Sequence, residues 1–214
     1  MLNLADLRRS YSLQSFTQAD AHPDPLRQFE KWFKEAADSQ VPEPNAMVLA
    51  TVSNTGQPAA RTMLLKGFDE RGFIFFTNYH SRKGGEIAEN PAAALLFVWL
   101  EVERQVRIEG KLEKIPVEES RAYFESRPKG SQIGAWASPQ SQQIANRQEL
   151  EAHVADLTAQ YADAAVLPLP PSWGGYVLRP HYYEFWQGRE NRLHDRIEYL
   201  QGSDGVWRTG RLAP

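Results

Sequence analysis

Cysteine is absent from this sequence of 214 residues. Its absence excludes disulfide bonds, thiolate zinc sites, thiol nucleophiles and iron–sulfur clusters held by cysteine. The five histidines form neither an HExxH motif nor a pair at i, i+4 spacing, so two imidazoles are not expected side by side on a helix. We therefore expect no metal site.

Long hydrophobic runs and an excess of positive charge are also missing. The longest apolar runs, such as 92–100, are about half as long as a helix that crosses a bilayer. The charged N-terminus is followed by no apolar segment typical of a signal peptide. The 24 lysines and arginines against 27 aspartates and glutamates give a net charge of −3, which argues against binding the phosphate backbone of nucleic acid. We expect a cytoplasmic protein without nucleic-acid or membrane partners.

The hydrophobic content of 42% is that of a folded protein, and its periodicity indicates many short strands with few helices. Helices are expected over 25–37, 80–90, 116–126 and 146–161, and strands over 47–53, 58–68, 73–78, 92–99, 104–115, 173–178, 182–187, 196–200 and 206–212. This pattern favours a mainly β (α+β) fold, an antiparallel barrel with peripheral helices. We expect a single domain over 25–214 after an N-terminal arm over 1–24.

Glycine-rich phosphate loops are missing as well, since no GxGxxG follows an expected strand and no GxxxxGK[ST] occurs. Phosphates would therefore have to be bound by side chains. Arg61 and Lys66 flank an apolar strand, and Arg82 with Lys83 opens a short helix whose free N–H groups favour an anion. Together they suggest a phosphate site, although surface ion pairs and a solvated helix end would explain the same residues.

Two further groups carry polar chemistry. Tyr123 and Arg127 share one face of an expected helix, and Ser131 follows just past its end, a set that suits a phosphate monoester. Arg192, His194 and Arg196 would share one face of an extended segment, with the Asp195 side chain on the other. Cations placed side by side repel one another, so the second group favours an anionic or electron-rich ligand.

These groups belong to a longer series of motifs that resembles the pyridoxine/pyridoxamine 5′-phosphate oxidase family. The resemblance runs from about Pro23 to Pro214. The motifs are Arg61-Thr-Met-Leu-Leu-Lys66, Phe76-Thr-Asn78, Ser81-Arg-Lys83, Glu103-Arg-Gln-Val106, Tyr123-Phe-Glu-Ser-Arg-Pro128, Ser131-Gln-Ile-Gly-Ala-Trp136, Ser172-Trp-Gly-Gly175, Glu184-Phe-Trp-Gln-Gly188 and Arg192-Leu-His-Asp-Arg196.

The resemblance implies a homodimer with an FMN-binding split β-barrel, antiparallel and of the Greek-key or meander type, with the flavins between subunits. The residues implied for FMN are Arg61, Thr62, Met63, Leu64, Leu65, Lys66, Phe76, Thr77, Arg82, Lys83, Gln105, Gln140, Ser141, Trp186 and Arg196. Phe76 departs from the family, which commonly has tyrosine there. The residues implied for substrate are Lys66, Tyr123, Arg127, Ser131, Arg192, Leu193 and His194, with Arg8, Arg9, Ser10 and Tyr11 in a segment that resembles a lid.

By the same resemblance, the protein would oxidise pyridoxine 5′-phosphate and pyridoxamine 5′-phosphate with dioxygen. The products would be pyridoxal 5′-phosphate and hydrogen peroxide, with ammonia from the amine, in vitamin B6 biosynthesis and salvage. Arg192 and His194 are the implied catalytic residues. Two alternatives stay open: a flavin- or vitamin-phosphate-binding protein without turnover, and a flavin reductase that uses a nicotinamide.

Overall fold

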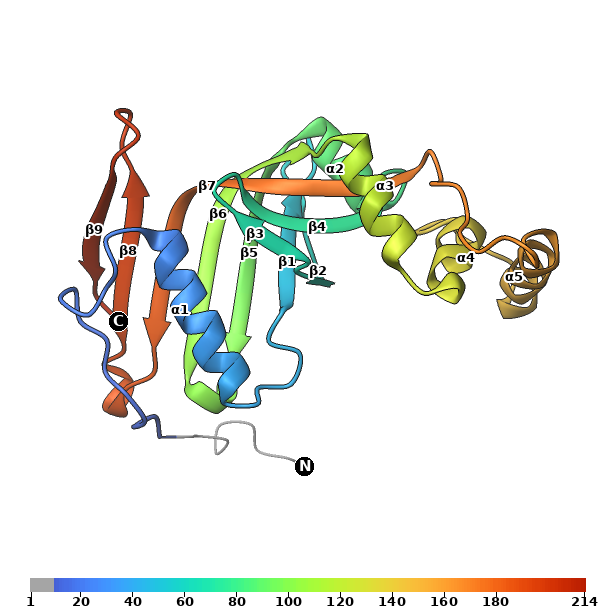
Figure 1. The fold of residues 1–214 in the computed structure, drawn as a ribbon. Helices are drawn as coiled ribbons and strands as arrows, with labels where there is room; N and C mark the ends of the chain where they lie inside the picture. Colours follow the sequence, from blue (N-terminus) through green and yellow to red (C-terminus); the bar gives the residue numbers. More distant parts are fainter. Residues whose placement is uncertain (1–9) are drawn as a thin grey trace, which may run out of the picture.

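The computed structural model describes residues 10–214 and is built around one nine-stranded sheet (Figure 1). The strands are β1 (Ala46–Val52), β2 (Pro58–Leu64), β3 (Gly67–Asp69), β4 (Gly72–Asn78), β5 (Ala92–Trp99), β6 (Arg104–Lys114), β7 (Trp173–Gln187), β8 (Asp195–Gln201) and β9 (Trp207–Leu212). The helices are α1 (Pro25–Asp38), α2 (Arg82–Glu89), α3 (Val117–Ser126), α4 (Lys129–Ala137) and α5 (Arg147–Gln160), with 3₁₀ turns η2 (Leu100–Val102) and η3 (Glu190–Arg192).

All strand pairings described are antiparallel, in the order β2-β1-β5-β6-β7-β4-β3, with β8 paired to β7 and β9 to β8. The long strand β7 organises this sheet. Its first half pairs with β4 and its second half with β8, while β6 follows it on the other side. The sheet thus divides along β7, which confirms the expected antiparallel, mainly β class.

Helix α1 forms where the sequence predicts it, because Asp24 caps its first turn and Pro25 is preorganised for the first helical position. Its apolar stripe buries Phe29 and Trp32 completely against the sheet. The ring of Phe29 lies 5.0 Å from that of Phe97, centre to centre. Figure 1 shows α1 lying against the sheet. The core between them is rich in aromatic rings.

Two parts of the predicted strand pattern were wrong. The expected strand over 58–68 is broken after Leu64, and β3 pairs separately with β4. The strands expected over 173–178 and 182–187 are one strand, because Pro180 lies at a register shift opposite Gly110, where its missing N–H is tolerated. A Cβ at Gly110 would lie 2.1 Å from a backbone oxygen, so this bulge requires glycine.

Helix α4 was not predicted at all. It packs with α3 and α5 around a second apolar cluster that contains Phe124, Ile133, Leu167 and Trp173. These helices extend from one end of the sheet, as Figure 1 shows. Among residues 10–214, no helix has the length and apolar character to span a membrane.

Candidate functional site

The start of α2 holds a buried lysine that gathers residues from three segments. Ser81 caps the helix, and the neighbouring Lys83 is 9% exposed. Its Nζ donates to Thr77 Oγ1 on β4 at 3.1 Å and to Gln140 Oε1 at 2.7 Å. Burial, and after it the charge of Arg61, lowers the pKa of Lys83. The structure thus brings Thr77, Lys83 and Gln140 together, as expected for residues that bind one ligand.

Two arginines complete this cationic cluster, defined here as Arg61, Arg82 and Lys83. Both are paired with one buried carboxylate, Glu86, at 3.0 Å for Arg61 Nη2 and 2.8 Å for Arg82 Nε. Burial acts to raise the pKa of Glu86, but hydrogen bonds from Thr51, Arg82 and Arg61 outweigh it and hold that pKa below its usual value. Glu86 therefore stays ionised among the cations.

The rest of the segment 61–66 lies around this cluster with mixed exposure. Leu65 is buried, Met63 and Leu64 are half-buried, and Thr62 and Lys66 are exposed. The backbone N–H of Lys66 donates to Ile74 O at 2.9 Å, which fixes the chain where β2 ends. Its side chain is thereby left at the surface.

A stack of aromatic rings leads from β4 to the second predicted group. Phe76 lies 4.0 Å from Tyr123 and 5.4 Å from Trp173, ring centre to ring centre, with near-parallel planes. The guanidinium of Arg127 lies 4.9 Å from the centre of the Trp173 ring. Phe76 thus supports Tyr123 through its ring, and this role does not need the hydroxyl of a tyrosine.

Arg127 and Ser131 line a cavity of about 270 Å³ between α4, β4 and the loop at Gln140. Burial lowers the pKa of Arg127, and its Nη1 atom is buried without a hydrogen-bond partner among residues 10–214. The spacing predicted that Arg127 shares a helical face with Tyr123. Instead, α3 ends at Ser126, and Arg127 follows it as the C-cap in an extended conformation. The cavity therefore contains a buried cationic donor that has no acceptor within the described chain.

The predicted residues Gln105, Trp186 and Arg196 form a row across three strands. Gln105 is in register with Trp186, and Trp186 with Arg196, on the outer face of the sheet. Arg196 Nε donates to the buried Glu184 at 2.7 Å. This ion pair raises the pKa of Arg196.

Arg192 and His194 follow in the turn after β7, which is not extended. Arg192 has a φ of 62° at the end of η3, so the shared strand face expected for Arg192, His194 and Arg196 is wrong for Arg192. The His194 ring lies 4.5 Å from that of Trp186. Burial, and next the charge of Arg192, lowers the pKa of His194. Leu193 is 66% exposed beside them.

The N-terminal segment reaches this turn from outside. The Tyr11 ring lies 5.8 Å from Trp186 and 5.9 Å from His194. A Cβ on Gly188 would lie within 3.0 Å of Tyr11, so the close approach requires glycine. Ser10 is exposed next to it, and the predicted lid residues Arg8 and Arg9 lie outside the described part of the chain.

The predicted FMN residues therefore form two groups. One contains the cationic cluster with Thr77 and Gln140, and the other is the row on the outer sheet face. Between the two groups, no hydrogen bond or ion pair is found within residues 10–214. Ser141 belongs to the exposed loop of the first group, with a φ of 70°.

The sequence did not predict the carboxylates that hold the arginines. Glu86 lies four residues after Arg82, a spacing that indicates a pair on a helix, but the second partner, Arg61, comes from another strand. Glu184 is similarly shared between Arg107 and Arg196. Such sharing depends on strand order, which the sequence pattern does not contain.

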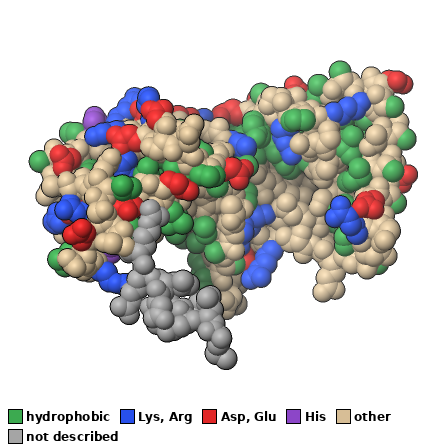
Figure 2. Space-filling model, turned by 90° about the horizontal axis from the view of Figure 1, so that it is seen from below, with side chains coloured by type: hydrophobic (Ala, Val, Ile, Leu, Met, Phe, Trp, Pro, Cys, Tyr) green, Lys and Arg blue, Asp and Glu red, His purple; other side chains and the backbone are tan. Residues whose placement is uncertain are grey.

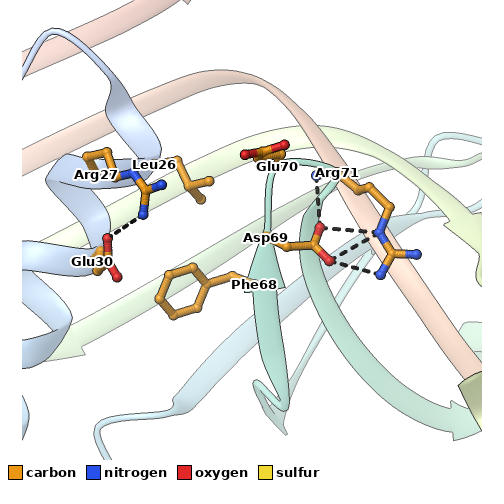
Figure 3. A pocket seen from close by; sticks show the side chains of 7 residues that line it. All are labelled: Leu26, Arg27, Glu30, Phe68, Asp69, Glu70 and Arg71. Carbon is orange, nitrogen blue, oxygen red and sulfur yellow. Dashed lines mark hydrogen bonds and ion pairs between the residues drawn. The ribbon is translucent and has the colours of Figure 1, made fainter.

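A larger cavity of about 440 Å³ lies between α1 and the β3–β4 turn and contains none of the predicted residues (Figure 3). Four of its five charged side chains pair with one another. Arg27 Nη1 donates to Glu30 at 2.8 Å, and Arg71 Nη2 to Asp69 at 2.8 Å. We therefore place the candidate site at the two predicted groups.

Seen from below, the molecule is hollowed in its middle, with hydrophobic and cationic side chains beside the hollow (Figure 2).

Known proteins of similar sequence match this chain over its whole length. The chain is 55% identical to pyridoxine/pyridoxamine 5′-phosphate oxidase of Cupriavidus metallidurans over 214 residues, and 57% identical to that of Burkholderia thailandensis over 216 residues, covering all of each chain. Among solved structures, PhzG from Burkholderia lata in complex with tetrahydrophenazine-1-carboxylic acid has a TM-score of 0.88 at 33% identity. The match covers 95% of this chain and all of PhzG.

An FMN-binding protein from Nostoc punctiforme related to pyridoxamine 5′-phosphate oxidase shares the fold, with a TM-score of 0.70 at 21% identity over 89% of this chain and 98% of that one. Two family models also match. One, described as pyridoxamine 5′-phosphate oxidase, covers residues 33–161, and the other, described as the pyridoxine 5′-phosphate oxidase C-terminal dimerisation region, covers residues 173–214. Their combined span includes both groups of site residues, and this chain belongs to the pyridoxamine 5′-phosphate oxidase family.

Proposed function

We propose that this protein is an FMN-dependent oxidase that converts pyridoxine 5′-phosphate and pyridoxamine 5′-phosphate to pyridoxal 5′-phosphate. Family membership supports the general activity. The observation that carries the choice of a phosphorylated substrate is the buried Nη1 of Arg127, which lacks an acceptor among the described residues. Leaving such a donor unpaired costs free energy, and a phosphate oxygen beside Ser131 would relieve that cost.

FMN is the cofactor, and the cationic cluster fits its phosphate. Arg61, Arg82 and Lys83 supply three positive charges, and Glu86 reduces the net charge to that of two cations. A phosphate monoester carries about −1.5 to −2 at pH 7, so the two charges match. Thr77 and Gln140, which already bond to Lys83, would complete this end of the site.

The row of Gln105, Trp186 and Arg196 would contact the ring end of a flavin. Because this row and the cationic cluster form separate groups in one chain, we assign each flavin to two copies of the chain, in a homodimer. The family model over residues 173–214, described as a dimerisation region, supports this assembly. Val98, which is 46% exposed beside Gln105, supplies apolar surface for a partner copy.

FMN, when bound, would supply the oxidation: a hydride equivalent from the C4′ carbon and a second proton from the substrate hydroxyl or amino group would together reduce dioxygen to hydrogen peroxide. With the amine substrate, water would then hydrolyse the resulting imine to the aldehyde and ammonia. Tyr123, Arg127, Ser131 and Lys66 would hold the substrate phosphate. With its phosphate anchored in this way, the substrate would be positioned so that its C4′ carbon, which lies away from the phosphate, can react.

Arg192 and His194 would act at the ring. The backbone N–H of Arg189 donates to His194 Nδ1 at 3.1 Å, so the neutral ring carries its proton on Nε2. That Nε2–H would hold the reacting alcohol or amine, while Arg192 and the neighbouring Leu193 would orient the ring. Tyr11, with Ser10, would cover the site from the N-terminal side.

The test is an absorbance spectrum of the purified protein, followed by anaerobic addition of pyridoxine 5′-phosphate and then of air. We expect flavin bands that bleach with substrate and return with oxygen, together with pyridoxal 5′-phosphate and peroxide. Flavin bands that do not bleach would support a binding protein. Bleaching by a nicotinamide alone, or by tetrahydrophenazine-1-carboxylic acid but not by the phosphate ester, would contradict the proposed substrate.

A further inference from the structure

Glu86 is a buried carboxylate that no step of the proposed reaction uses. It is 6% exposed and lies in the second turn of α2, below the cationic cluster. Both of its oxygens are occupied. Oε2 accepts from Thr51 Oγ1 at 2.6 Å and from Arg61 Nη2 at 3.0 Å, and Oε1 accepts from Arg82 Nε at 2.8 Å.

This bonding fixes two guanidinium groups with one side chain. Arg61 comes from β2 and Arg82 from α2, and no other carboxylate is paired with either of them within residues 10–214. Thr51 secures the arrangement from β1, since its hydroxyl oxygen also accepts from Arg61 Nη1 at 2.5 Å. Arg82 uses Nε for Glu86, and no protein partner is found for its two terminal nitrogens in the described chain.

We infer that Glu86 is a positioning residue for the cofactor phosphate: it holds Arg61 and Arg82 at the separation that one phosphate group needs. This inference rests on the proposed function, because it takes the cationic cluster as the phosphate site of FMN. Glu86 acts through the two arginines and does not touch the phosphate. A carboxylate oriented by three hydrogen bonds keeps both cations in place before the cofactor arrives, which lowers the ordering cost of binding.

The negative charge of Glu86 also has an opposing effect, because it repels a phosphate. The geometry favours the positioning effect, since both oxygens of Glu86 already accept hydrogen bonds from the protein, two of them from the guanidinium groups themselves. Glu86 also acts to raise the pKa of Lys83 against burial and the charge of Arg61, and so helps to keep that lysine protonated. Arg61 also bonds to Thr51, so removing the carboxylate would release mainly Arg82. It would also lower the pKa of Lys83 further.

The test compares FMN with riboflavin, which has the same ring system and ribityl chain but no phosphate. Apoprotein is titrated with each flavin, and binding is followed by the change in flavin fluorescence. We expect Glu86→Gln to raise the Kd for FMN by about tenfold or more and to change the Kd for riboflavin less than about twofold. Glu86→Asp keeps the charge, but its side chain is too short to reach both arginines. Its Kd for FMN should therefore lie between that of the wild type and that of the Glu86→Gln variant.

Glu89→Gln is the matched control, because Glu89 is exposed on the same helix, and it should bind both flavins as the wild type does. Thr51→Val gives a second variant should Glu86→Gln not fold, with an FMN-specific loss of about threefold or more expected from one lost hydrogen bond. Thermal melting of each apoprotein shows that it is folded.

Unchanged or tighter FMN binding by the Glu86→Gln variant would overturn the inference, and so would an equal loss of FMN and riboflavin, which a general structural role predicts. Failure of the proposed function looks different. If the wild type bound FMN no more tightly than riboflavin, the cationic cluster would not be the phosphate site at all, and the inference would be overturned with it.

Discussion

Arg127 is the residue whose surroundings most directly call for a ligand, since its buried Nη1 has no acceptor in the described chain. We predict that Arg127→Ala raises KM for pyridoxine 5′-phosphate by about tenfold or more and lowers kcat much less. A charge-assisted hydrogen bond contributes roughly 1.5 to 3 kcal/mol, and this one would lie far from the reacting carbon. Steady-state kinetics would measure the split.

The control for Arg127→Ala is Arg121→Ala, which removes an exposed arginine from α3 and should leave both constants unchanged. A loss in kcat with an unchanged KM would contradict the assignment of Arg127 to phosphate binding.

His194 offers a prediction about pH. Burial and the charge of Arg192 lower its pKa from the usual value near 6.5, so the ring is neutral at pH 7 and accepts from Arg189. We predict that NMR titration of the His194 ring gives a pKa below 6.5, and that Arg192→Ala moves it upward. As the pH falls through this pKa, the ring gains a proton on Nδ1 and loses the hydrogen bond, so kcat/KM should decline on the acid side.

The resonance would be assigned with His194→Asn. A measured pKa at or above 6.5, or no response to Arg192→Ala, would argue against the buried, Arg192-facing ring.

For single residues, the sequence predicted which charged and hydroxyl side chains belong to the site, but not which partners fix their positions. The helical spacing of Arg82 and Glu86 is visible in the sequence, whereas the contact of Arg61 with the same carboxylate requires β2 to lie beside α2. The φ of Arg192 is equally invisible, because an arginine rarely adopts a left-handed conformation without a tertiary reason.

Among the elements, the N-terminal segment is held by an unusual anchor. Glu103 is 3% exposed with a φ of 56°, and its Oε2 accepts from the backbone N–H groups of Ser12 and Leu13 at 2.9 and 3.0 Å. Its backbone oxygen accepts from Gly188 at 2.7 Å. The same residue thus connects the segment that carries Tyr11 to the turn that carries His194.

We predict that Glu103→Gln speeds hydrogen exchange at the amides of Ser12 and Leu13 and lowers the free energy of unfolding by about 1 to 3 kcal/mol, because a buried charged acceptor is lost. Hydrogen-exchange NMR or mass spectrometry would measure the first effect and denaturant unfolding the second. Glu101→Gln changes an exposed carboxylate nearby and should do neither. Unaltered exchange in the Glu103 variant would show that the anchor is not needed.

The predicted elements follow local signals, and the errors occur where tertiary contacts decide. Strong periodicity predicted α1 and β6 because each has one buried face. The sequence predicted two strands, one on each side of Pro180, yet pairing with β6 carries β7 through this residue at a bulge. Helix α4 has a weak apolar pattern and forms against α3 and α5, so its own sequence gave little sign of it.

For the whole molecule, the antiparallel class followed from the number of short strands, but the position of each flavin residue did not. The cationic cluster lies on β2 and α2, whereas the row of Gln105, Trp186 and Arg196 crosses β6, β7 and β8, so the order of strands decides that they form two groups. A sequence pattern shows that both groups exist. The pattern does not show that the two groups are separate within one chain. This separation is the reason for proposing a site shared by two copies.

That proposal predicts the effect of a charge on the outer sheet face. Val98 is 46% exposed and in register with Gln105, so a partner copy would bury it. Val98→Asp would place an unpaired carboxylate in that contact, and burying an unpaired ion costs several kcal/mol for each copy. We predict that sedimentation analysis shows a shift from dimer to monomer at low micromolar concentration, and that the bound FMN falls in parallel because each flavin loses the contacts that the partner copy would supply.

Val166→Asp is the control, since Val166 is 44% exposed in the link after α5 and lies off the sheet. It should leave both the dimer and the FMN content unchanged. Loss of the dimer with full retention of FMN by the Val98 variant would show that a single chain completes the flavin site. A dimer that persists with both variants would place the interface elsewhere, because a buried unpaired carboxylate at Val98 is too costly for the contact proposed here.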